Sequence, residues 1–197
     1  QGAENLERIG DAALDAGVKI LTVWAFSTEN WKRTKREVSY LMRLLKTIKD
    51  KLDMFHRMNV RVVYSGRIHG FSKELQTILA DVQRETRNNT RGIMNFALNY
   101  GGHAEIVDAM KAVLKKGIAP GRLTPELIAA NLYHPELPPP ELIIRTGGEQ
   151  RLSGFLSWQS EYSELAFTSR LWPEFSPADL RRIIDDYSFL RKAHEKF

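Results

Sequence analysis

Residues 18–26 read Val-Lys-Ile-Leu-Thr-Val-Trp-Ala-Phe, a nearly continuous apolar run. Such a run is typical of a strand covered on both faces, because a strand with one solvated face alternates apolar and polar residues. Residues 3–16, which precede it, have the apolar period of an amphipathic helix and end at Gly17, a common helix terminator. The stretch therefore predicts a buried strand that directly follows a helix.

The same alternation continues along the rest of the chain. Further strands are expected at 60–65, 92–100 and 141–146, and further helices at 37–57, 72–88, 103–116, 124–133 and from 176 almost to the end. No internal repeat, low-complexity segment or domain boundary interrupts this pattern. Strands that alternate with helices predict a single α/β domain over residues 1–197, with a mainly parallel central sheet flanked by helices on both faces.

The expected helix 37–57 has a broad apolar face. Its main stripe recurs at spacings of three and four, and further apolar residues widen it: Tyr40, Met42, Leu44 and Met54. Such width most often means ordinary core packing. The alternative is that this long helix walls an elongated hydrophobic tunnel.

Composition excludes several classes of protein. The chain has 197 residues, of which 43% are hydrophobic, and a net charge of +5 from 29 Lys and Arg against 24 Asp and Glu. The hydrophobic fraction excludes an intrinsically disordered chain, and the absence of cysteine excludes disulfides, thiol nucleophiles and Cys-type metal sites. No apolar run approaches the roughly 18 residues of a transmembrane helix, and no signal peptide is visible. We therefore expect a cytoplasmic protein, and no nucleic-acid partner, because the aromatic residues are not interleaved with basic ones.

In open α/β sheets ligands bind beyond the carboxyl ends of the strands, which selects three loops. The first loop, residues 26–33, reads Phe-Ser-Thr-Glu-Asn-Trp-Lys-Arg and gathers hydroxyl, carboxylate, amide and guanidinium groups. Helix capping by Ser27 or Thr28 explains this pattern equally well. The second loop, residues 99–102, contains two glycines, which permit either the close approach of a ligand or merely a tight turn.

The third loop, residues 145–153, is the most informative and reads Arg-Thr-Gly-Gly-Glu-Gln-Arg-Leu-Ser. It offers two guanidinium groups, two glycines that free backbone N–H groups, and two hydroxyls. This combination suits a phosphate or diphosphate, since guanidinium binds phosphate oxygens in pairs and backbone amides add donors. The alternative is a solvated basic loop. Downstream, a carboxylate of Glu161 or Glu164 near a diphosphate would be a natural Mg²⁺ ligand, although each alone is a typical surface charge.

These segments resemble the cis-prenyltransferase family, in its bacterial undecaprenyl diphosphate synthase type. The matching motifs cover nearly the whole chain and are FSTENWKR at 26–33, NVRV at 59–62, ALNYGG at 97–102, IRTGGEQRLSGFL at 144–156, and YSELAF and LWPEF within 162–175. The resemblance implies a Mg²⁺-dependent transferase that condenses an allylic diphosphate, such as farnesyl diphosphate, with successive isopentenyl diphosphates. The implied product is a cis-polyprenyl diphosphate, above all undecaprenyl diphosphate as a lipid carrier for cell-wall synthesis.

The resemblance also implies roles for single residues. Asn30 would help to remove a proton from the condensing isopentenyl unit, and Glu164 would bind Mg²⁺. The substrate-binding residues would be Ser27, Thr28, Glu29, Trp31, Arg33, Arg145, Arg151, Leu152 and Ser153. The apolar tunnel beside helix 37–57 would hold the growing chain. Family members are homodimers that release a lipid product, so a homodimer interface within 155–175 and transient contact with a membrane surface are expected as well. Burial within the monomer explains the aromatic residues of 155–175 equally well.

The sequence departs from the family pattern at its start. The family's aspartate-bearing loop, D-G-N-G-R-W-A, would lie before Gln1, so the resemblance implies an N-terminally incomplete catalytic domain. Without that loop the chain is expected to have little activity. The alternatives that remain open are a noncatalytic lipid-binding or regulatory subunit of the same fold and a synthase of shorter cis-prenyl chains.

Overall fold

Two parallel sheets form the centre of the structure, a computed structural model that describes residues 2–194. The larger sheet has the order β1 (Ile20–Ser27), β3 (Gly92–Tyr100), β2 (Val60–Ser65). The smaller sheet pairs β4 (Leu142–Arg145) with β5 (Glu164–Phe167). Every pairing is parallel, as the alternation of strands and helices predicted. The carboxyl ends of paired strands therefore lie at the same edge of their sheet. The first two loops follow β1 and β3 of the larger sheet, and the third follows β4 of the smaller sheet.

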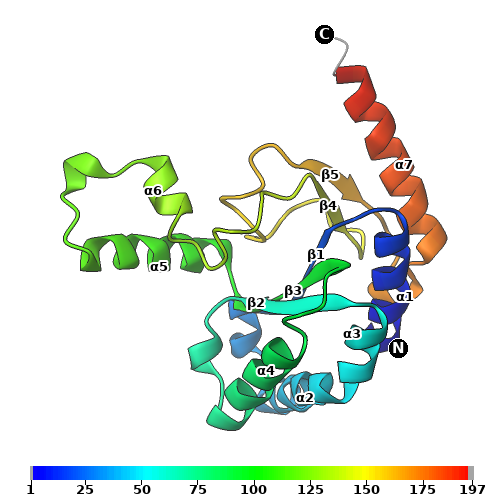
Figure 1. Ribbon diagram of the computed structural model, residues 1–197, viewed down its shortest axis with the longest axis horizontal. Coiled ribbons are helices and arrows are strands. Elements are labelled where there is room, and N and C mark those ends of the chain that lie inside the picture. Colours follow the sequence, from blue (N-terminus) through cyan, green and yellow to red (C-terminus); the bar gives the residue numbers. More distant parts are fainter. Residues whose placement is uncertain (1, 195–197) are drawn as a thin grey trace.

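The helices pack around these sheets. They are α1 (Gly2–Asp15), α2 (Lys35–Lys46), α3 (Leu52–Arg57), α4 (Lys73–Glu85), α5 (Gly102–Lys115), α6 (Pro125–Ala129) and α7 (Pro177–His194), with 3-10 turns η1 (Thr28–Lys32), η2 (Thr47–Lys51), η3 (Ile68–Gly70), η4 (Pro120–Arg122) and η5 (Trp172–Glu174). Figure 1 shows α2, α3 and α4 below the larger sheet, α1 beside α7, and α5 with α6 extending away from the rest. None of the helices in residues 2–194 is both long and apolar enough to traverse a bilayer.

The main hydrophobic core lies between the larger sheet and helices α2, α3 and α4. Phe55, Val62 and Val82 are fully buried in it, with Met94 of the central strand beside them. Residues 94–100 of β3 are buried without interruption, because this strand has a neighbour on each edge and chain on each face. The apolar run of β3 thus reflects burial on both faces. The prediction that residues 18–26 form a fully buried strand is only partly right, because Phe26 is the one buried residue of β1 and residues 20–25 line a cavity.

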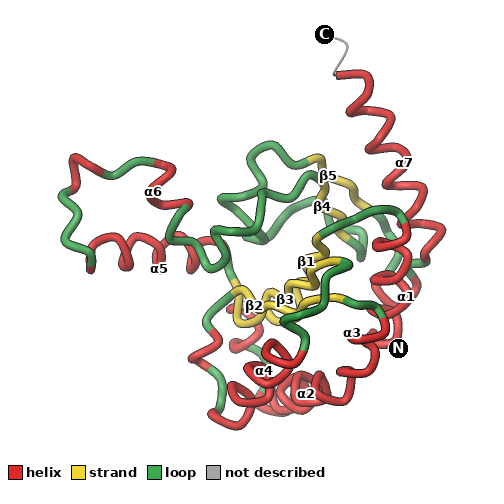
Figure 2. Tube along the Cα trace, viewed as in Figure 1, coloured by secondary structure: helices red, strands yellow, loops and turns green. Residues whose placement is uncertain are grey.

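The prediction of one helix over 37–57 is wrong. The segment consists of α2, the 3-10 turn η2 and α3 (Figure 2). The Thr47 hydroxyl donates to the Leu44 carbonyl at 2.8 Å, a local bond that competes with the regular helical pattern. Apolar spacings of three and four continue across the turn, so periodicity alone could not reveal it. The prediction of a helix over 124–133 is also too long, since α6 ends at Ala129, and β5 was not predicted as a separate strand.

A cavity of about 1280 Å³ lies between the two sheets. Residues 20–25 of β1 line one side and residues 142–145 of β4 line another. In the described part of the chain, each of these strands pairs with one neighbouring strand only. Apolar side chains of the α2–η2 segment also face the cavity, namely Tyr40, Leu41, Leu44, Leu45 and Ile48.

Candidate active site

The first loop forms the 3-10 turn η1 at the carboxyl end of β1. The Ser27 backbone N–H donates to Oδ1 of Asn30 at 2.8 Å, so the Asn30 side chain closes the turn. The Lys32 ammonium pairs with the Glu29 carboxylate at 2.6 Å, and both side chains are exposed. The capping interpretation therefore holds in a modified form, in which Asn30 supplies the accepting side chain.

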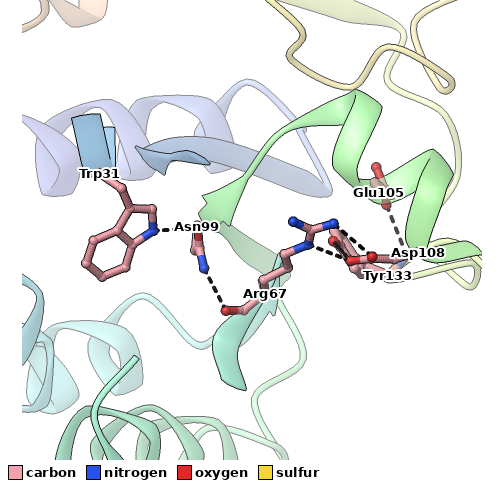
Figure 3. Close-up of polar contacts among 6 residues, drawn as sticks. All are labelled: Trp31, Arg67, Asn99, Glu105, Asp108 and Tyr133. Atoms are coloured by element: carbon pink, nitrogen blue, oxygen red, sulfur yellow. Dashed lines mark hydrogen bonds and ion pairs between the residues drawn. The ribbon is translucent and has the colours of Figure 1, made fainter. Parts of the chain in front are cut away.

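Trp31 fastens this loop to the core. Its ring packs against Phe26 and Phe71, with centroids 5.1 and 5.9 Å away. Its indole N–H donates to Oδ1 of Asn99 at 2.8 Å (Figure 3). The Trp31 side chain is nevertheless 40% exposed, so one part of it remains available at the surface.

The second loop supports the first. Asn99 adopts a φ of +48°, a left-handed conformation that asparagine tolerates better than most residues. Its Nδ2 donates to the Arg67 carbonyl at 3.0 Å, while its Oδ1 accepts from Trp31. A Cβ at Gly101 would lie 2.7 Å from Oγ1 of Thr28. The close approach for which this glycine is needed is therefore to the first loop.

A partly buried ionic cluster lies next to Asn99 (Figure 3). The Arg67 guanidinium donates to both carboxylate oxygens of Asp108, at 2.7 and 2.9 Å, and the Tyr133 hydroxyl donates to the same carboxylate at 2.7 Å. The hydrogen bonds from Arg67 hold the pKa of Asp108 below its usual 3.8. Sequence reasoning missed this cluster, because its members are far apart in the chain and carry no motif.

The third loop places the Arg145 side chain against the Ser153 side chain and the Arg151 backbone. Nη1 of Arg145 donates to the Ser153 hydroxyl at 2.8 Å and also to the Arg151 carbonyl. The Arg151 guanidinium pairs with Glu149 at the surface. Arg145 forms no ion pair with any carboxylate of the described residues, so its positive charge is not neutralised within this part of the chain.

The prediction that Gly147 and Gly148 leave free backbone N–H groups is wrong. Their N–H groups donate to the carbonyls of Arg170 and Thr168, at 2.8 and 2.9 Å. Both glycines have positive φ values, +92° and +82°, which let the loop turn back against this segment. The anion-binding capacity of the loop therefore rests on its side chains.

The predicted site residues do not all lie at the cavity. Arg145 and Leu152 line the cavity, whereas residues 27–33 do not. Arg33 is exposed and lies 3.9 Å from Glu37. Glu164 begins β5, and Arg145 pairs in register with Phe167. Glu164 thus lies three residues below that level, or roughly 10 Å along the strand.

Segment 155–175, expected at a homodimer interface, is partly used within the chain. The Trp172 indole N–H donates to the Gly2 carbonyl at 2.9 Å, and its ring packs against the cluster of α1 and α7. Tyr162, Leu165 and Phe167 are exposed, at 90%, 45% and 37%. Leu171 is exposed as well, at 56%, so an interface here would have four large apolar side chains, two of them on β5.

Comparisons with known proteins agree with the resemblance of the sequence motifs. A family model described as "Putative undecaprenyl diphosphate synthase" matches residues 1–195. The isoprenyl transferase of Thermotoga maritima is 43% identical over 95% of this chain and 82% of its own length, and that of Streptococcus pneumoniae is 44% identical over 100% and 80%.

Two solved structures are also similar. A probable undecaprenyl diphosphate synthase from Campylobacter jejuni matches with a TM-score of 0.86 and 30% identity, over 95% of this chain and 88% of that one. Lavandulyl diphosphate synthase from Lavandula x intermedia, in complex with dimethylallyl diphosphate, matches with a TM-score of 0.87 and 30% identity, over 94% and 83%. The sequence motifs, the parallel α/β fold and these similarities together show that the chain belongs to the undecaprenyl diphosphate synthase family of isoprenyl transferases.

Proposed function

We propose that the protein elongates an allylic diphosphate with isopentenyl diphosphate and that the third loop holds the isopentenyl diphosphate group. The supporting observation is the Arg145 guanidinium, which has neutral oxygen partners, no paired carboxylate among the described residues, and a position at the edge of an apolar cavity. A diphosphate would supply the missing negative charge through charge-assisted hydrogen bonds. Arg151 and Ser153 would add donors to the same group.

In the proposed reaction, the bond between the allylic C1 and its diphosphate oxygen breaks, and C1 bonds to the terminal alkene carbon of isopentenyl diphosphate. A proton then leaves C2 of the isopentenyl unit, and inorganic diphosphate, released from C1 of the allylic substrate, is the leaving group. Asn30 would orient the proton's acceptor, because an amide is not itself a base and its Oδ1 already accepts from the Ser27 N–H. Ser27, Thr28, Glu29, Trp31 and Arg33 would contact the allylic substrate near this point.

The apolar cavity would receive the growing hydrocarbon. Its wall at α2 and η2 is made of Tyr40, Leu41, Leu44, Leu45 and Ile48, and β1 adds the small Ala25. A cavity of about 1280 Å³ has room for a long prenyl chain. This favours a long product, such as undecaprenyl diphosphate for cell-wall synthesis.

Magnesium fits the described residues only in part. Glu164 offers one carboxylate, and residues 2–194 contain no group of three or more His, Asp or Glu side chains that could hold a metal ion. Mg²⁺ commonly uses one or two carboxylates together with substrate phosphates and water. Glu164 as a ligand stays a prediction, and its distance along β5 from Arg145 is a reason to test it by titrating magnesium against Glu164→Gln.

A second candidate is a shorter-chain synthase. It is favoured by the similarity to lavandulyl diphosphate synthase, whose structure contains dimethylallyl diphosphate. The TM-score of this match, 0.87, is as high as the 0.86 of the Campylobacter jejuni structure. The chain length of the product distinguishes the two candidates, since both share the donor site. Homodimerisation through Tyr162, Leu165, Phe167 and Leu171 and transient contact with a membrane surface complete the proposal.

The test uses a form of the protein that carries the aspartate-bearing loop expected before Gln1. It supplies labelled isopentenyl diphosphate, farnesyl diphosphate and magnesium and measures labelled lipid by length. Arg151→Ala should raise the KM for isopentenyl diphosphate about tenfold, the size of one hydrogen bond to a charged group, and that for farnesyl diphosphate much less. Equal changes in both KM values would contradict the assigned role. Binding of both substrates without elongation would instead indicate a lipid-binding or regulatory subunit.

A further inference from the structure

Glu105, in the first turn of α5, carries a deeply buried carboxylate. Among the residues whose burial the structure describes, it is the only charged one that is buried, at 2% exposed. Burying a carboxylate costs several kcal/mol unless hydrogen bonds replace its water. A group retained at such cost usually holds something in place, so its partners are informative.

Three donors from three parts of the chain meet this carboxylate. The Tyr100 hydroxyl at the end of β3 donates to Oε2 at 2.5 Å, and the Gln159 amide donates to the same oxygen at 3.0 Å. The Tyr133 backbone N–H, after α6, donates to Oε1 at 3.0 Å (Figure 3). Burial and the Glu105 charge raise the pKa of the Tyr100 hydroxyl, which therefore remains a donor.

Gln159 belongs to the segment that follows directly on the third loop. Its Oε1 is buried without a hydrogen-bond partner, so the side chain is fixed by its donor end alone. Closer to the loop, the Gly102 N–H donates to the Gly154 carbonyl at 2.7 Å. A Cβ at Gly102 would lie 2.4 Å from the Ser157 hydroxyl oxygen. The first turn of α5 thus contacts residues 154–159 at two positions, through Gly102 and through Glu105.

We propose that Glu105 is a positioning residue for the diphosphate site, acting through Gln159. By holding residues 154–159 against α5, it keeps Ser153 beside Arg145, where the two side chains are 2.8 Å apart. This inference rests on the proposed function, because it assigns to Glu105 the task of ordering the loop that would bind isopentenyl diphosphate. Glu105 and Gln159 border the apolar cavity, but the hydrogen bonds of Glu105 go to Tyr100, Tyr133 and Gln159 and not to residues 145–153.

One turn further along α5, Asp108 provides a matched comparison. It supports the first loop, since its partner Arg67 accepts from Asn99, which in turn accepts from Trp31 (Figure 3). Tyr133 contacts both carboxylates by different atoms: its hydroxyl binds Asp108 and its backbone N–H binds Glu105. Tyr133→Phe therefore removes a bond to Asp108 and leaves the three bonds to Glu105.

The experiment compares Gln159→Ala, Glu105→Ala, their double variant and the control Tyr133→Phe. Calorimetry measures the Kd of isopentenyl diphosphate in the presence of magnesium, and hydrogen exchange measures protection of the amides in residues 153–159. Gln159→Ala should weaken binding about tenfold, the size of one hydrogen bond to a charged group. Protection of residues 153–159 should fall with it. The double variant should be no weaker than Glu105→Ala, because both changes break the same link.

The outcomes separate this inference from the proposed function. Wild-type affinity and wild-type protection in Gln159→Ala would overturn the positioning role and leave the proposed function intact. An additive double variant, or an equal loss in Tyr133→Phe, would overturn it too. If the wild-type chain binds no isopentenyl diphosphate, the proposed function fails, and the positioning of the diphosphate site fails with it. Should Glu105→Ala not fold, Gln159→Ala decides alone, since it removes a half-buried side chain that already has an unpaired oxygen.

Discussion

The first and third loops both place polar side chains at the carboxyl end of a parallel strand, yet the fold uses them differently. In the first loop Lys32 is paired with Glu29, and Trp31 is packed on two aromatic rings. In the third loop the Arg145 guanidinium meets a carbonyl and a hydroxyl but no carboxylate of the described residues. A cluster of polar residues therefore indicates a ligand site most clearly where one charge is left without its counterion.

The largest effect that follows from this comparison is expected on stability at the first loop. Trp31→Ala should lower the free energy of unfolding by about 2 to 3 kcal/mol, somewhat less than for a fully buried aromatic residue, because it removes packing on Phe26 and Phe71 and leaves Asn99 without a donor. Urea denaturation measures this. The control is Tyr162→Ala, whose side chain is 90% exposed.

The comparison fails if Trp31→Ala unfolds like the wild type but loses affinity for farnesyl diphosphate. Trp31 would then act on substrate alone, and the first loop would be a binding loop in the same sense as the third. Loss of stability together with loss of affinity would mean that the anchor also serves the substrate.

The next effect is expected on binding at the third loop. Arg145→Ala should weaken the binding of inorganic diphosphate by about ten- to a hundredfold, the range of hydrogen bonds to charged groups. The free energy of unfolding should change by less than about 1 kcal/mol, because the lost partners are a loop carbonyl and the hydroxyl of the exposed Ser153. Calorimetry at two salt concentrations measures the affinity.

Lys32→Ala is the matched control, since it removes the same charge from the first loop. Its effect on the diphosphate Kd should be less than about threefold and should disappear at high salt, as for a distant exposed charge. If Lys32→Ala weakens binding as strongly as Arg145→Ala, the net positive charge of the surface binds diphosphate, and the third loop has no special role.

The sequence could predict those features that depend on local pattern. The strands were visible as apolar runs, although β1, unlike β2 and β3, is buried only at Phe26. Arg145 and Ser153 could be placed in one loop because they follow one strand within nine residues. The same local reasoning failed for Gly147 and Gly148. Their N–H groups donate to the carbonyls of Arg170 and Thr168. These two residues follow β5, a strand that the sequence did not predict.

The supporting residues could not be predicted for a related reason. Glu105 has the sequence context of an ordinary charged residue in a first helical turn, where acidic residues are common. Its burial depends on Gln159 and Tyr133, which lie 54 and 28 residues away. For Asn99 the sequence did contain a local indication of its backbone conformation, because an asparagine at a strand end is suited to a positive φ.

The smallest effect is expected from acid. The Arg67 guanidinium lowers the pKa of Asp108 below 3.8, so the ion pair contributes stability above the unfolded pKa and loses it as the pH falls through the lower, folded value. Asp108→Asn should therefore unfold more easily than the wild type at pH 6, by on the order of 1 kcal/mol for a partly exposed pair. The two proteins should converge as the pH approaches 3 and below. Asp81→Asn, which breaks an exposed pair with Arg84 on α4, is the control.

Hydrogen exchange decides which loop this acid-sensitive pair supports. In Asp108→Asn at pH 6, the amides of residues 27–33 should lose protection, because Arg67 holds Asn99 and Asn99 holds Trp31. The amides of residues 145–153 should keep theirs, since this loop is held by the carbonyls of Thr168 and Arg170 and, through residues 154–159, by Glu105. Loss of protection in both loops would mean that α5 moves as one rigid unit, and the division of labour between its two carboxylates would then be wrong.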